Sequence, residues 1–189
     1  MASVEIFGFF LTIAGVVLAS HQHLSSWLLS IVSSIIYIFI FFQVKLYADV
    51  LLQFFFISLS VYGFYCWKEG KSKLIAAVRK ITKKEIFLST FFVIFSCSCL
   101  YFFLNNFTNS DVPFADSFLT TLSLLATWLT AKKIIENWWI WIVADILYSY
   151  LFWYKELYVT SFLYLILSSL AIYGLVKWKK QILEVSKLL

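Results

Sequence analysis

Long apolar segments with short polar breaks dominate the chain. A membrane-spanning helix needs about 20 mostly apolar residues, because each residue advances about 1.5 Å across a hydrocarbon core of about 30 Å. Only two connections are long: a basic linker at 68–85, and a polar loop at 105–113. The pattern predicts seven transmembrane helices, with bounds near 4–20, 24–43, 46–67, 86–104, 114–132, 138–154 and 157–178.

The apolar pattern repeats at an offset of 111 residues, the spacing between Trp27 and Trp138, with no gap over residues 24–68. Segments one to three therefore repeat as segments five to seven. Because each repeat has an odd number of spans, the additional fourth segment gives both repeats the same orientation. This 3+1+3 plan of two parallel three-helix repeats is that of SWEET-type carriers, which bind their ligand between repeats near the bilayer midplane. Further identical pairs are Ile31/Ile142, Tyr37/Tyr148, Tyr62-Gly63/Tyr173-Gly174 and Trp67-Lys68/Trp178-Lys179.

Composition agrees with a membrane protein. The chain has 189 residues, of which 62% are hydrophobic and 13% charged, whereas about a quarter of the residues of a soluble domain are charged. The expected fold class is therefore an all-α integral membrane protein. No cleavable signal peptide is predicted, because the first segment lacks a basic start and continues as a span. Residues 1–189 form one membrane domain, composed of a first repeat (4–67), a linker with its helix (68–104), a second repeat (114–178) and a tail (179–189).

Positive charge is distributed unevenly between the two sides. Thirteen of the fifteen Lys and Arg fall on one side of the seven-span arrangement, and only Lys45 and Lys155 fall on the other. The positive-inside rule places the N-terminus outside and the C-terminus in the cytoplasm. The formal net charge of +5 then reflects topology rather than a nucleic-acid surface, and the linker can meet anionic lipid head groups.

Asp145 is an acidic residue in the middle of the sixth segment, and its repeat mate is Ser34. A carboxylate at the bilayer centre costs about 2.5–3.5 kcal/mol, so it should face a cavity or a partner. Two interpretations remain open. The carboxylate contacts a ligand, for which low dielectric favours a cation, or it makes a structural hydrogen bond, for example to Tyr148 or a serine.

Aromatic side chains share the helical face of this acid. Trp138, Trp141, Asp145 and Tyr148 are spaced i, i+3, i+7 and i+10, which places them on one face. Such a face can stack on a flat ring or hold a cation. Trp138 and Trp139 lie near the end of the span and fit an interfacial aromatic belt. Trp141 is deeper and is the better binding candidate.

Amides supply further candidates. Gln53, about one-third into the third segment, can both donate and accept, which suits hydroxyl recognition, although a polar contact between helices is equally open. Its repeat mate is Tyr164. Gln43 and Asn137 lie near opposite ends of the spans and are candidate gate contacts. Glu136 precedes the sixth segment, where a carboxylate would cap the helix N-terminus.

Other features predict structure rather than chemistry. Gly63 and Gly174 are repeat mates that permit close helix approach. The three cysteines and two histidines do not have metal-site spacing. No nucleotide-binding glycine loop or catalytic constellation is recognisable in the sequence. An enzyme, a bound metal and a cofactor are therefore not expected.

Several motifs together resemble the PnuC family of vitamin transporters. They are residues 41–53 (FFQVKLYADVLLQ), Tyr62-Gly63 followed by Trp67, the run Glu136-Asn137-Trp138 followed by Trp141, and Leu157-Tyr158. The similarity extends from Ile6 to Trp178. Members of the family often have asparagine where Ser33 and Ser60 stand, and some have asparagine where Asp145 stands.

The resemblance implies a SWEET-like transporter in a bacterial inner membrane that takes up nicotinamide riboside by facilitated diffusion, with trapping by a cytosolic kinase. Related members carry thiamine, which is the alternative, and a homo-oligomer is compatible with the sequence. The expected mechanism is a rocking of the two three-helix bundles around a midplane site. The candidate substrate-binding residues are Trp141, Asp145, Tyr148, Gln53, Tyr164, Asn137, Gln43, Ser33, Ser60 and Tyr37.

Overall fold

The computed structural model describes residues 2–43, 47–70, 78–108 and 110–188. Within this part every regular element is a helix, and the connections between helices contain one isolated β-bridge, between Arg79 and Ile134. The predicted fold class and the approximate positions of the seven helices are confirmed, but α7 continues well past 178. The helices are α1 (Ala2–Ser20), α2 (Ser25–Gln43), α3 (Tyr47–Gly70), α4 (Lys83–Phe107), α5 (Pro113–Ala131), α6 (Asn137–Tyr154) and α7 (Tyr158–Leu188).

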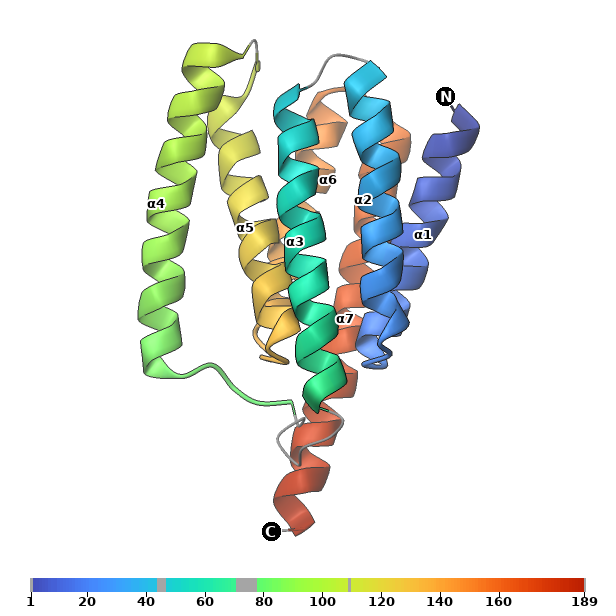
Figure 1. Ribbon diagram of the computed structural model, residues 1–189, viewed down its shortest axis with the longest axis vertical. Coiled ribbons are helices and arrows are strands. Elements are labelled where there is room, and N and C mark those ends of the chain that lie inside the picture. The colour runs from blue at the N-terminus through green and yellow to red at the C-terminus, as the bar shows by residue number, and fades with distance from the viewer. Residues whose placement is uncertain (1, 44–46, 71–77, 109, 189) are drawn as a thin grey trace.

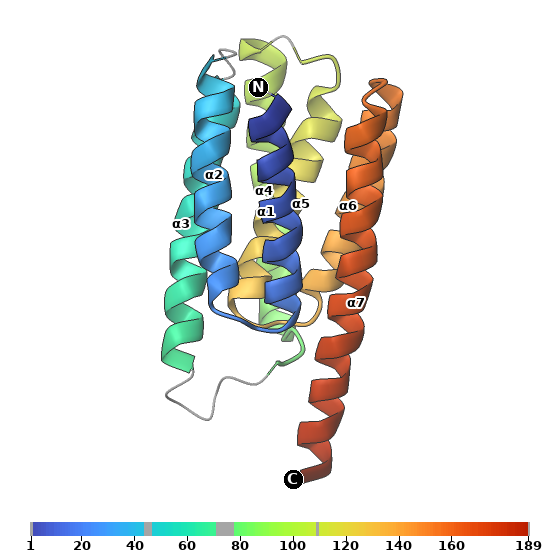
Figure 2. The same cartoon turned by 90° about the vertical axis from the view of Figure 1, so that its right-hand side faces the viewer.

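Six of the helices form a closed ring. Its neighbours run in the order α1, α2, α3, α5, α6, α7 and back to α1, while α4 packs outside the ring on α5 (Figures 1 and 2). Each contact in the first repeat has its counterpart in the second: α1–α2 with α5–α6, and α2–α3 with α6–α7. The contacts that join the repeats, α3–α5 and α7–α1, are also counterparts. The ring therefore has an approximate twofold axis along the bundle, as parallel repeats require.

Four of the described helices, α2, α3, α4 and α7, contain stretches long and apolar enough to qualify as membrane spans by themselves. The spanning window of α4 has no buried residues, and Phe87, Phe91 and Phe95 point away from the bundle. Lipid is the solvent that such a surface requires. The helix α5 carries several buried hydroxyls, which explains why its sequence is not apolar enough to qualify as a span by itself.

The segment before α4 is attached to the second repeat. Arg79 bridges to Ile134, its guanidinium binds Glu85 at 2.7 Å, and Thr82 and Glu85 form a capping box at the start of α4. The carboxylate of Glu136 accepts the Ile81 N–H at 3.0 Å and makes no side-chain cap to α6. The side-chain cap predicted for Glu136 is therefore wrong, because its carboxylate accepts a hydrogen bond from the linker backbone instead of from the first turn of α6. Residues 71–77 of the linker lie outside the described part.

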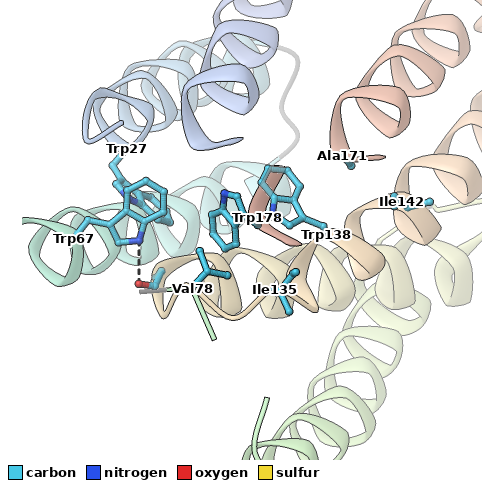
Figure 3. Close-up of a cluster of buried hydrophobic side chains, with 9 residues drawn as sticks. Trp27, Trp67, Val78, Ile135, Trp138, Ile142, Ala171 and Trp178 are labelled. Atoms are coloured by element: carbon cyan, nitrogen blue, oxygen red, sulfur yellow. Dashed lines mark hydrogen bonds between the residues drawn. The ribbon is translucent and has the colours of Figure 1, made fainter. Parts of the chain in front are cut away.

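Four buried indoles close one end of the ring, here called the linker end, where α3 and α7 lie near the linker. These residues, Trp27, Trp67, Trp138 and Trp178, form the tryptophan cluster (Figure 3). The pair Trp27/Trp67 in the first repeat corresponds to the pair Trp138/Trp178 in the second, because Trp27 is the repeat mate of Trp138 and Trp67 that of Trp178. Their ring centroids lie 5.2 Å and 5.4 Å apart, both edge-to-face, and Trp67 and Trp178 meet at 6.4 Å. The interfacial belt predicted for Trp138 is wrong, because its ring is buried between α6 and α7.

The two central indoles of this cluster, those of Trp67 and Trp178, bond reciprocally across the repeats. Trp67 in the first repeat donates to the carbonyl of Ala131 at 3.1 Å, dashed in Figure 3. Trp178 in the second repeat donates to the carbonyl of Ser20, also at 3.1 Å. Ser20 and Ala131 are repeat mates that end α1 and α5. Each repeat thus satisfies a carbonyl that the end of the other repeat's first helix leaves without an intrahelical partner.

The turns that follow these carbonyls are also equivalent. Gln22 and Lys133 are repeat mates, and both have φ of 53°. The N–H of His23 donates to Leu18 and that of Ile134 to Leu129, the six-residue bond of a Schellman cap. The caps and the two indoles together account for the carbonyls at the ends of α1 and α5.

Two glycines make room for the remaining indoles. A Cβ on Gly63 would lie 2.5 Å from the Trp27 ring, and one on Gly174 would lie 2.6 Å from the Trp138 ring. Real Cβ atoms do not approach so closely, so only glycine fits. The predicted close approach at these glycines is confirmed, and the group that approaches is an indole from the preceding helix.

Loss of either reciprocal indole bond should destabilise the ring to a similar extent. We expect Trp67→Phe and Trp178→Phe each to lower the free energy of unfolding by about 1 kcal/mol or more, because a buried carbonyl loses its donor. Thermal unfolding followed by circular dichroism in detergent would measure this loss. Trp139→Phe is the control, because Trp139 is 58% exposed. Unchanged stability of both cluster variants would contradict the reciprocal bonds.

The glycine positions should be more sensitive than other helical glycines. Gly63→Ala and Gly174→Ala should each destabilise the fold by about 1–3 kcal/mol, because an added methyl overpacks the indole. Gly15→Ala is the matched control, since its Cβ would meet Leu29 at an ordinary 3.9 Å. The yield of monodisperse protein and its melting temperature would report the effect. Equal tolerance at all three positions would refute the packing.

Candidate functional site

Polar side chains on α2 and α6 face the interior of the ring. Asp145 is 4% exposed and its repeat mate Ser34 is 6% exposed, whereas the adjacent Ile146 and Ile35 are exposed. The apolar neighbours therefore face outward to lipid and the polar pair faces inward. The repeat places these two positions at the same depth on the two helices, one turn further into the bundle than Trp141 and Ser30.

The Asp145 carboxylate is buried, and no residue that the structure describes supplies it with a counter-charge. No hydrogen bond or ion pair joins it to any described residue. The structural hydrogen bond to Tyr148 or a serine, one of two interpretations from sequence, is therefore not observed. An unpartnered carboxylate at this depth carries a large desolvation cost, which a cationic ligand in the ring would offset.

Three aromatic rings stack beside this carboxylate. Tyr148 of α6 and Tyr164 of α7 lie 4.8 Å apart between ring centroids with an interplanar angle of 28°, and Phe152 stacks on Tyr164 at 5.3 Å. Asp145 and Tyr37 are both near enough to Tyr164 to act on it electrostatically. Tyr37 belongs to α2 in the other repeat, and a Cβ on Gly8 of α1 would lie 3.3 Å from its hydroxyl. The structure thus gathers Asp145, Tyr148, Tyr164 and Tyr37 from both repeats.

Other predicted site residues lie apart from this group. Trp141 packs against the tryptophan cluster, one helical turn from Asp145 toward the linker end. Asn137 is fully buried, and its amide is occupied within the α5–α6 turn by Ile134 (2.6 Å) and Thr130 (3.0 Å). Gln43 is exposed at the other end of the ring, here called the far end.

The remaining candidates are distributed over α2 and α3. Gln53 is half-buried on α3, at the depth that Tyr164 occupies on α7. Ser33 and Ser60 are buried, and their repeat mates are Ala144 and Ala171. The hydroxyls of Ser33 and Ser60 therefore belong to one repeat only, as the carboxylate of Asp145 belongs to the other.

A polar face of α5 was not recognised from sequence. The hydroxyl of Tyr148 lies near the hydroxyls of Ser123 and Thr120, and the carboxylate of Asp116 is also in its neighbourhood. The spacing of Asp116, Thr120 and Ser123, i, i+4 and i+7, could have indicated this face.

An apolar hollow of about 460 Å³ lies between α5 and α6 at the far end. Exposed rings, among them Phe114, Tyr150 and Tyr154, line it. It opens on the outer surface of the bundle and lacks the charged and amide groups of the interior. Lipid chains suit this surface, whereas the candidate functional site is the polar group inside the ring.

Comparisons with known proteins agree with this architecture. Residues 2–180 match the family described as "Nicotinamide mononucleotide transporter". Two relatives, from Escherichia coli (strain K12) and Shigella flexneri, are named "Nicotinamide riboside transporter PnuC". Each is 28% identical over 196 residues, covering 88% of this chain and 82% of the relative.

A solved structure described as "Crystal structure of the Vitamin B3 transporter PnuC" superposes with a TM-score of 0.74 at 21% identity, covering 97% of this chain and 83% of that chain. This likeness establishes the shared fold. The match of the family over nearly the whole sequence, together with a helical ring of apolar exterior and polar interior, identifies the chain as a member of the nicotinamide mononucleotide transporter family, a family of membrane transporters rather than enzymes.

Proposed function

We propose that the protein takes up nicotinamide riboside through the interior of the ring. The observation that carries this proposal is the buried, unpartnered Asp145 beside the stacked Tyr148 and Tyr164. Nicotinamide riboside has a flat pyridinium ring with a positive charge. A carboxylate offsets this charge, and the faces of aromatic side chains stack on the flat ring and attract the cation.

The remaining candidates have roles along the path. Gln53 and Tyr164 bind hydroxyl or amide groups of the substrate, since an amide both donates and accepts. Trp141 forms the floor of the site above the tryptophan cluster. Ser33, Ser60 and Tyr37 line the side contributed by the first repeat. Gln43 and Asn137 act near the two ends, and Asn137 acts there by keeping the α5–α6 turn rigid.

The riboside fits this interior better than the mononucleotide does. A mononucleotide adds a phosphate that is a dianion near neutral pH. Phosphate binding calls for Arg, Lys or a helix N-terminus. The predicted spans contain only two lysines, Lys132 and Lys177, both at the linker end of their spans, and the interior group presents a carboxylate. The charge of the site therefore favours a substrate that is cationic overall.

Thiamine is the alternative substrate. Its thiazolium ring is also flat and cationic, so Asp145 and the tyrosine pair suit it equally well by charge. The two vitamins differ in their second half, which is a hydroxyl-rich ribose in one and an aminopyrimidine in the other. Direct comparison of binding decides between them.

Transport is proposed to proceed by facilitated diffusion in a bacterial inner membrane, with a cytosolic kinase trapping the product. The two repeats rock around the interior site, and the reciprocal indole bonds break when the linker end opens. The positive-inside pattern places the linker end, and with it the C-terminus, in the cytoplasm and the N-terminus outside. A homo-oligomer is compatible with this arrangement.

Substrate choice is tested by titrating purified protein with each vitamin. We expect quenching of tryptophan fluorescence by nicotinamide riboside, because Trp141 lies one turn from Asp145, and weaker or no binding of the mononucleotide. Calorimetry on the same samples provides a readout independent of light absorption by the ligands. Binding of thiamine but not of the riboside would replace the first choice by the alternative, and binding of neither would overturn both.

Asp145→Asn tests the role of the carboxylate. Removing the charge should weaken riboside binding by at least about tenfold and raise the melting temperature, because a buried charge without a counter-charge is costly. The reduced riboside, whose ring is neutral, should bind the variant and the parent equally. Calorimetry and circular dichroism measure both effects. A purely structural role for Asp145 would instead give a lower melting temperature and unchanged affinity.

A further inference from the structure

One face of α5 continues the interior site toward the far end of the ring. Asp116, Thr120 and Ser123 are spaced i, i+4 and i+7, which aligns their side chains along the helix. Ser123 is 5% exposed, while Asp116 and Thr120 are half-buried. Leu125 and Leu129 lie on a different face and pack against α4. The hydroxyl face therefore points away from α4, toward the ring.

Tyr148 joins this face to the interior group. Its hydroxyl lies near those of Ser123 and Thr120, on the side of α5 that faces away from α4. Its ring stacks on Tyr164 at 4.8 Å. One side chain thus places its polar end near the α5 hydroxyls and its ring in the aromatic stack, so the two sets of groups are neighbours in the ring.

The carboxylate of Asp116 lies at the outer limit of this lining. It is in the first turn of α5, and Ser110 donates to it at 2.6 Å, which fixes its orientation. Seven residues separate Asp116 from Ser123, a rise of about 10 Å along the helix. This length is comparable with that of a nucleoside, so a substrate can contact the α5 face and the Asp145 region together.

The α5 face carries two hydroxyls that its repeat counterpart on α1 lacks, while Asp116 corresponds to the acidic Glu5. Thr120 corresponds to Phe9 and Thr127 to Val16 on α1, while Ser123 corresponds to Thr12. Tyr37, the mate of Tyr148, directs its hydroxyl toward Gly8 instead. The hydroxyls at 120 and 127 are therefore not required by the repeat packing.

We propose that Asp116, Thr120 and Ser123 form an outer subsite that binds cationic, hydroxyl-bearing substrates before they reach Asp145. The carboxylate attracts the cation at the far end, and the hydroxyls bind its polar groups as it moves inward past Tyr148. This inference rests on the proposed uptake of a cationic nucleoside. It makes Asp116 a determinant of affinity and charge preference, separate from Asp145.

The test measures initial uptake rates in proteoliposomes for the cationic riboside and its neutral, reduced form. Asp116→Asn should raise KM for the cationic form about tenfold, since one charge is lost from the path, with KM for the neutral form unchanged. Asp116→Glu retains the charge and should preserve the preference for the cation. Asp111→Asn is the matched control, because Asp111 is an exposed carboxylate at the same end, and it should behave like the parent.

The outcomes separate the two proposals. An unchanged KM for the cation in Asp116→Asn, or an equal loss for both forms, would overturn the outer subsite while uptake by the parent still supports the proposed function. Failure of the parent to take up riboside would overturn the proposed function and, with it, this subsite. Thr120→Val should raise KM for both forms, because a hydroxyl contact does not depend on ring charge.

Discussion

Two indole N–H groups, those of Trp67 and Trp178, hold the two repeats together. Each bonds to the last carbonyl of the other repeat's first helix, Ala131 or Ser20. A helix end leaves its final carbonyls without intrahelical partners, and at the buried end of a membrane bundle water is a poor substitute. The bonds are equivalent under the twofold repeat, so they close the ring at both junctions, and the closed ring directs Asp145 and Ser34 inward.

In the proposed rocking mechanism, the same cluster keeps the linker end closed. The interior group around Asp145 lies on the far side of these indoles. Two further indole N–H groups, of Trp27 and Trp138, are buried without a hydrogen-bond partner in the described part of the structure. A buried donor without a partner destabilises the state that contains it. If the linker end opens as proposed, water that reaches these donors would offset part of the loss of the reciprocal bonds.

Much of the architecture follows from the sequence because the repeat is explicit. An offset of 111 residues pairs Trp27 with Trp138 and Gly63 with Gly174, and both pairs have the same packing in the structure. The approach of Asp145, Tyr148, Tyr164 and Tyr37 is consistent with the candidates drawn from helical spacing and repeat position. Their binding roles stay predictions.

Other features depend on which face of each helix the ring encloses, and a single helix does not reveal this. The hydroxyls of Thr120 and Ser123 resembled ordinary small polar residues of a span until Tyr148 was placed against them. Trp138 resembled a belt residue by its position near the helix end, yet Gly174 opens a buried space for its ring. Glu136 has the position of a helix cap, but its carboxylate accepts a hydrogen bond from the linker backbone, which is distant in sequence.

The central claim is that substrate binds inside the ring, between the two repeats. A structure determined with bound nicotinamide riboside tests it most directly. Binding inside the ring predicts density for the pyridinium ring next to Asp145, Tyr148 and Tyr164, with the tryptophan cluster on its linker side. Density in the apolar hollow between α5 and α6, or an interior filled only by side chains, would contradict it.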